Sequence, residues 1–248
     1  VRVASDTSQA NLAAVLSVVD PEGRATLMTY GVLNLTHRDS HADPSPLPAG
    51  QAVEATVQLN VIGQRIPKGY RLRLALSQSY WPILWPSARK AQLTVESARL
   101  DLPVRPVPAS EPALPDFGPP EGATPLQSET HEPGSESRTR TLDYATGVET
   151  YRRTDDTGLV THRHTGLTLR AASSDTFRLH PDDPNSAVVT CRWDKSFARG
   201  DWRTELTAEV TVSALADVWR IEATLQAWDM NGIVADRTWF EEIPRDLA

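Results

Sequence analysis

The sequence predicts an all-β fold of antiparallel strands, and two observations support this. Apolar and polar residues alternate in several segments, among them Val53–Leu59 and Leu72–Leu76. Because successive strand side chains point to opposite faces, such segments have one buried and one solvated face. Turn motifs separate the segments, at residues 20–23, 47–50 and 67–69. Several short strands with this spacing favour an antiparallel, jelly-roll-like sandwich.

Individual elements follow from the pattern. In residues Asn11–Val19, apolar side chains occupy both odd-numbered and even-numbered positions, which predicts a central strand covered on both faces. Alternate residues of 202–212 and of 219–227 form two long apolar faces. Asn231-Gly232 predicts a type I′ hairpin turn before a last strand at 233–243. The later part of the chain is therefore expected to form a second, large antiparallel sheet, one face of which needs a cover.

The proline distribution divides the chain into three parts. Residues 1–105 form the jelly-roll-like region. Residues 106–138 are rich in proline, which cannot donate to a sheet ladder, and predict an extended connector. Residues 139–248 form the second antiparallel β region, which either packs on the first or completes it.

Composition excludes several classes of protein. The formal net charge of −7 argues against a nucleic-acid partner. No apolar run approaches the roughly 20 residues that span a bilayer, so no membrane segment is expected. The single cysteine, Cys191, excludes an intrachain disulfide and fits a reducing compartment, which suggests a cytoplasmic protein. The first residues, Val1–Asp6, already have the pattern of a strand running into a turn, so we expect the chain to be a piece of a larger protein.

Two motifs carry a resemblance to a known family. The first is Gly31-Val32-Leu33-Asn34-Leu35-Thr36-His37-Arg38, after the turn at residues 20–24. The second is Tyr80-Trp81-Pro82-Ile83-Leu84-Trp85-Pro86, after residues 67–74. As an ordered set they resemble the C-terminal region of the X-Pro dipeptidyl-peptidase/cocaine-esterase (CocE/NonD) family of serine hydrolases, over roughly the first hundred residues.

The resemblance implies a β jelly roll, similar to galactose-binding domains, that follows an α/β-hydrolase domain. The family's Ser, Asp and His triad belongs to that hydrolase domain, so no catalytic residue and no cofactor are expected here. The sequence also lacks a G-x-S-x-G nucleophile motif. The family's upstream strands are absent, which would leave a sheet edge unpaired. We expect them to be replaced by the later half of the chain, by a second copy in a homodimer, or by an upstream piece.

Candidate ligand or substrate-rim residues come from the two motifs. Trp81 and Trp85, with Tyr80 beside them, would stack on a sugar or line a pocket; the alternative is packing between sheets, which is the default for Trp. His37 and Arg38 are the second candidate group. Together with Asp39 and His41, His37 has the spacing of a strand metal site, but a polar strand end is the favoured interpretation and no metal is expected.

Two other motifs have structural interpretations. Cys191 is expected to be a small residue of an apolar strand face rather than a nucleophile. Asn34-Leu35-Thr36 has the form of a glycosylation sequon but lies in an apparent strand.

The sequence therefore predicts the non-catalytic C-terminal β region of a serine hydrolase, supporting the catalytic domain, the pocket rim or oligomer contacts. The expected partner is the α/β-hydrolase domain. The alternatives are a carbohydrate-binding module, or a structural domain that assembles through its edge strands.

Overall fold

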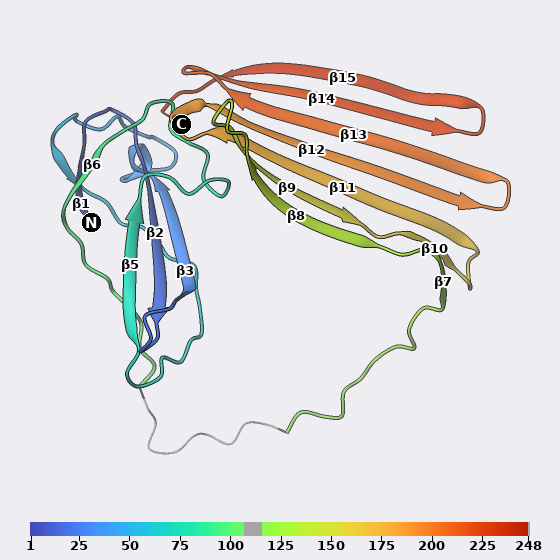
Figure 1. Cartoon of the computed structure of the whole chain (residues 1–248), viewed down its shortest axis with the longest axis horizontal. Helices are drawn as coiled ribbons and strands as arrows, with labels where there is room; N and C mark the ends of the chain where they lie inside the picture. Colours follow the sequence, from blue (N-terminus) through green and yellow to red (C-terminus); the bar gives the residue numbers. More distant parts are fainter. Residues whose placement is uncertain (107–115, 248) are drawn as a thin grey trace.

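A computed structural model describes residues 1–106 and 116–247, and it confirms the all-β, antiparallel class (Figure 1). Within that part of the chain the only helical element is a short 3-10 turn, η1 (Leu35–His37). The strands form two small sheets in the N-terminal half and one large sheet in the C-terminal half. We refer to the two halves as the N-terminal unit and the large sheet.

The N-terminal unit consists of two three-stranded antiparallel sheets, in the orders β4-β1-β6 and β3-β2-β5. Their strands are β1 (Arg2–Ser5), β2 (Asn11–Val19), β3 (Ala25–Asn34), β4 (Ala52–Glu54), β5 (Arg71–Ser77) and β6 (Leu93–Ser97). As predicted, β2 is the central strand of its sheet, and most of its residues are buried. The finer jelly-roll topology stays a prediction.

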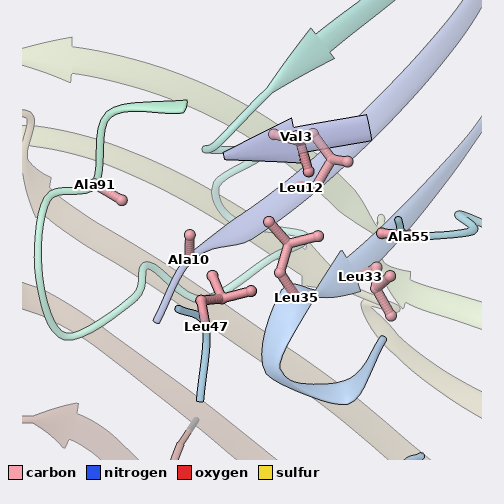
Figure 2. Packing of buried hydrophobic residues seen from close by; sticks show 8 residues of the cluster. All are labelled: Val3, Ala10, Leu12, Leu33, Leu35, Leu47, Ala55 and Ala91. Atoms are coloured by element: carbon pink, nitrogen blue, oxygen red, sulfur yellow. The ribbon is translucent and has the colours of Figure 1, made fainter. Parts of the chain in front are cut away.

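The core of this unit lies between the two sheets (Figure 2). Leu12 of β2 and Val3 of β1 are both 1% exposed, and Leu35 of η1 is fully buried. Around them pack Ala10, Leu33, Leu47, Ala55 and Ala91. Both faces of β2 are therefore covered by protein, as its apolar residues at odd and even positions predict.

The strand expected from Val53 to Leu59 forms only in part. β4 ends at Glu54, and the following residues run beside β3 without a ladder. Asn60 N donates to Tyr30 O at 3.0 Å, while its own carbonyl oxygen accepts from Thr29 Oγ1 at 2.8 Å. These isolated bonds replace the regular pairing that the alternation predicted.

Gly31 of β3 permits this close approach. A Cβ atom at Gly31 would lie 2.2 Å from the carbonyl oxygen of Gln58 and 3.1 Å from Cγ1 of Val57. The first of these contacts is with backbone, so the whole 55–60 segment would have to move.

We expect Gly31→Ala to lower the free energy of unfolding by about 2–3 kcal/mol, because the added methyl group overpacks a fixed backbone contact. Urea denaturation would measure it. The matched control is Gly63→Ala, since a Cβ there meets nothing within 4 Å. Equal stabilities for the two variants would contradict the close approach.

The large sheet follows the order β15-β14-β13-β12-β11-β10-β7, and β11 also pairs with β9, which pairs with β8. Its strands are β7 (Ser128–Glu132), β8 (Ser135–Leu142), β9 (Glu149–Asp156), β10 (Leu159–His162), β11 (Leu167–His180), β12 (Asp183–Arg199), β13 (Trp202–Ala214), β14 (Val218–Asp229) and β15 (Gly232–Pro244). No ladder joins it to the N-terminal sheets in the described residues, so it packs on them without completing them.

The predicted end of the connector differs from the structure. The connector was expected to run to residue 138, but β7 begins at Ser128 and β8 at Ser135. Pro133 lies in the turn between them, where a missing N–H costs no ladder bond. Residues 107–115 of the connector lie outside the described residues.

The last hairpin is present but shifted by one residue. Asp229 pairs with Gly232, so the loop is Met230-Asn231, and only Gly232 has a positive φ, of 123°. Elsewhere, the described part of the chain contains no helix with the length and hydropathy that a membrane span requires.

Candidate functional site

The two candidate indoles lie where the N-terminal unit meets the large sheet. The segment 80–91 leaves β5 and lies against β11 and β14. Trp81 packs edge-on against Trp85, with ring centroids 5.3 Å apart, and against Phe177 of β11 at 6.2 Å. Trp85 in turn packs against Trp219 of β14 at 5.0 Å. The two tryptophans therefore contribute to an aromatic contact between the halves of the chain.

Tyr80 anchors the same loop to the N-terminal unit. Its ring lies 5.2 Å from that of Tyr30 on β3, and its carbonyl oxygen accepts from Leu84 N at 2.8 Å. Asn11 Nδ2 of β2 also donates to Trp85 O at 2.8 Å. The loop is thus fixed from one side by hydrogen bonds and from the other by aromatic packing. Tyr80, Trp81 and Trp85 are all half-buried.

Arg245, just after β15, is the charged residue at the centre of this contact. It is 4% exposed. Its Nη1 atom donates to Leu215 O at 3.1 Å and to Asn185 Oδ1 at 3.3 Å, and its Nη2 atom donates to Pro86 O in the loop. The guanidinium carbon lies 4.8 Å from the ring centroid of Trp219. One side chain therefore connects the loop with three parts of the large sheet.

Burial lowers the pKa of the Arg245 guanidinium below its ordinary value. An arginine nevertheless stays protonated in proteins. The structure therefore holds a buried positive charge against carbonyl and amide oxygens and an aromatic face. Sequence analysis did not single out Arg245; the only available signal was a charged residue directly after the Pro244 that ends the last strand.

Further polar contacts flank the aromatic ones. Asn185 Nδ2 donates to Ala88 O at 3.1 Å, and Lys90 Nζ pairs with Asp182 at 2.8 Å, although both ends of that ion pair are well exposed. Exposed ion pairs of this kind contribute little stability. The buried and half-buried contacts of Arg245 and Asn185 therefore dominate the polar part of the junction.

The Asn34-Leu35-Thr36 motif holds the end of the chain. Asn34 Nδ2 and Thr36 Oγ1 both donate to Leu247 O, at 2.6 and 2.8 Å, and Thr36 is 1% exposed. Asn34 Oδ1 also accepts from Thr36 N at 3.1 Å, which caps η1. The motif thus acts as a clamp on the C-terminal segment, and its amide nitrogen is already engaged.

The second group of candidates, His37 and Arg38, lies at the other end of η1. Arg38 donates to Ser45 O and Ser45 Oγ, both at 3.0 Å, and to Leu35 O at 3.2 Å. It therefore joins η1 to the loop that follows. The rings of His37 and His41 are 5.4 Å apart, and His37 Nδ1 is buried without a hydrogen-bond partner in the described residues.

Neither group has the geometry of a metal centre. Within residues 1–106 and 116–247, no three His, Cys, Asp or Glu side chains are grouped so that they would hold an ion. Cys191 lies in the middle of β12, where burial first, and the neighbouring Asp175 second, raise the pKa of its thiol to about 11. A thiol held protonated at neutral pH is a poor nucleophile, which favours the structural interpretation of Cys191.

An open groove borders the N-terminal unit on another side. Its volume is about 650 Å³, and its lining includes Leu12, Leu76, Leu93 and Val95 together with Asp6. Among the described strands, β5 pairs only with β2, and β6 pairs only with β1. Each small sheet thus has one edge strand beside the groove, β5 or β6, while β3 and β4 are the edge strands on the other side.

Together, the structure defines an all-β protein whose candidate residues chiefly join two β units. Comparison with known families identifies it further: residues 1–132 match the X-Pro dipeptidyl-peptidase C-terminal non-catalytic domain. The match covers more than half of the chain, so the protein belongs to this family. The resemblance inferred from the two motifs is thereby confirmed. No curated protein matches the chain. Strands β8 to β15 lie beyond the matched residues.

Proposed function

We propose that this chain is the non-catalytic C-terminal β region of a serine hydrolase of the X-Pro dipeptidyl-peptidase type, and that it braces the α/β-hydrolase domain of that enzyme. The family description supports the non-catalytic part of the proposal. The acyl-transfer chemistry, with a Ser nucleophile and a His base, belongs to the hydrolase domain. The lone cysteine fits a reducing compartment, and we propose a cytoplasmic location.

The observation that carries the bracing role is the groove along β5 and β6. An unpaired sheet edge offers a row of backbone N–H and C=O groups to another polypeptide. Both strands are largely exposed, and Leu72 and Val95 are each 41% exposed although they belong to sandwich strands. A partner that lays backbone along these edges and apolar side chains into the groove would satisfy both requirements.

The Trp81–Trp85 loop remains our candidate for a pocket rim. Ile83, at its tip, is 56% exposed, while the indoles on either side are held by aromatic neighbours. A rigid loop with an exposed apolar tip is suited to lining the edge of a neighbouring site. The aromatic contacts also occupy ring surface on which a sugar would stack. The carbohydrate-binding alternative stays an untested prediction.

Two measurements test the proposal. The chain alone is expected to leave X-Pro peptides and simple esters unhydrolysed, and it is expected to bind the separately produced α/β-hydrolase domain of the same enzyme. A lysine in an exposed edge strand blocks strand addition, so we expect Leu72→Lys to weaken that binding about tenfold or more. Isothermal titration calorimetry would measure the affinity.

The matched control is Thr224→Lys, an exposed position on the large sheet. It is expected to leave binding unchanged. Hydrolysis by the purified chain would overturn the non-catalytic assignment, and failure to bind the hydrolase domain would overturn the bracing role. A dimer of the chain that Leu72→Lys dissociates would instead support the edge-paired homodimer.

A further inference from the structure

The large sheet has one apolar face, as the alternation of β13 and β14 predicts. The register places Val210 of β13 opposite Cys191 of β12 and Ala223 of β14, with Trp239 of β15 next in the same row. Paired residues share a face, and alternate rows repeat it. We define the apolar face by its apolar side chains, which are Leu169, Ala171, Trp193, Phe197, Leu206, Ala208, Val210, Ala223, Leu225, Ala227 and Trp239, with Cys191. The charged residues Asp175, Lys195 and Arg237 lie in the same rows, and Lys195 Nζ lies 5.5 Å from the ring centroid of Trp193.

The opposite face is polar, and its side chains are paired with one another. Asp194 accepts from Arg192 at 2.8 Å and from Thr207 at 2.7 Å, and the hydroxyl groups of Thr190 and Thr211 are 3.1 Å apart. This face therefore needs no protein cover. Of the two faces of these strands, only the apolar one needs to be covered by protein.

The N-terminal unit covers only one end of the apolar side of the sheet. Its tryptophans contact Phe177, near the end of β11, and Trp219, near the start of β14. Figure 1 shows the N-terminal unit at one end of the large sheet. Farther along the strands, Trp193 and Trp239 are each 47% exposed and Val210 is 38% exposed. A contiguous exposed apolar surface of this kind marks an interaction site.

The width of the open face limits what can cover it. Five strands at about 4.8 Å spacing and four same-face rows at about 6.8 Å spacing give a footprint of roughly 650 Å². A single helix is about 10 Å wide and would cover about two strands. A second sheet of equal width covers all five strands at once, as in a β-sandwich. A copy of the same chain supplies such a sheet.

The borders of the face are compatible with self-association. Glu136 and Arg138 on β8 form an ion pair with each other, and Arg140 pairs with Glu149 at 2.5 Å. The charges of these two pairs are therefore compensated within each copy. An apolar centre with aromatic side chains and a charged border is also the usual anatomy of a protein–protein interface.

We propose that two copies of the chain associate through this apolar face, sheet against sheet. The planar footprint is of the order of the roughly 800 Å² of accessible surface per partner that a specific interface buries, since protruding side chains add to the planar area. This interface is distinct from the edges of β5 and β6, so it stands independently of the bracing role.

Sedimentation velocity across the micromolar range tests the proposal. The wild-type chain is expected to dimerise, and Val210→Lys is expected to raise the dissociation constant about 100-fold or more, because a lysine charge would be buried in the apolar interface. Thr224→Lys, on the polar face, and Leu72→Lys, on the open edge of β5, are the controls, and neither is expected to change the dissociation constant.

A second readout needs no variant. Cys191 lies beside Val210 on the apolar face, so its alkylation by a maleimide is expected to slow as the wild-type concentration rises. A wild-type chain that stays monomeric, or a dimer that only Leu72→Lys dissociates, would overturn the proposal. It would also be overturned if Val210→Lys, and not Leu72→Lys, abolished binding of the hydrolase domain, because that domain would then cover the face.

Discussion

Replacing Arg245 with methionine is expected to lower the free energy of unfolding by about 2–4 kcal/mol, because buried acceptors lose their donor. The guanidinium donates hydrogen bonds to oxygen atoms of Asn185, Leu215 and Pro86, which come from both halves of the chain. Methionine keeps much of the volume, so the loss would reflect hydrogen bonds and charge rather than a cavity. Guanidinium chloride denaturation, followed by far-UV circular dichroism at low protein concentration, would measure it.

The effect should be concentrated in the large sheet. In the described residues, this sheet has few fully buried apolar side chains of its own, chiefly Ala187 and Ala214, both next to the junction. Limited proteolysis should therefore cut the Arg245→Met variant first in β11–β15. The control Arg199→Met changes an exposed arginine and is expected to stay within about 0.5 kcal/mol of wild type. Equal stability of the two variants would show that Arg245 does not hold the halves together.

Replacing Trp85 with alanine is expected to cost about 3 kcal/mol, since a large side chain packed between Trp81 and Trp219 would leave a cavity. The measurement is urea denaturation of single and double variants with Trp219→Ala. Edge-to-face aromatic pairs contribute about 0.5–1.5 kcal/mol beyond buried area, so the double-mutant cycle should give a coupling energy of that size.

The control for Trp85 is Trp202→Ala, because Trp202 is 50% exposed at the start of β13. Its expected cost is about 1 kcal/mol or less, since half of the side chain already contacts water. A coupling energy near zero between positions 85 and 219 would mean that the direct contact of these two rings does not stabilise the junction.

The sequence predicted the class of fold because strand periodicity is local. The pattern of apolar residues in β2, and their alternation in β13 and β14, depends only on the side to which each residue points. The structure has strands at all three places, as predicted. Family membership was likewise predictable, because the two motifs keep their order along the chain. Boundaries were predicted less well at β4 and β7, where alternation or proline content alone does not decide whether a neighbouring strand is close enough to pair.

The junction between the halves was decided by tertiary structure. Nothing local marks Arg245 as buried: its partners at positions 86, 185 and 215 are distant in sequence and meet only when the large sheet packs on the loop. The same holds for the clamp of Asn34 and Thr36 on Leu247, which spans more than two hundred residues. The sequence by itself determined strand character, the apolar face and the family. Packing determined that the predicted tryptophan site joins the two β units, because side-chain contacts between distant segments follow from how whole sheets stack and have no local pattern.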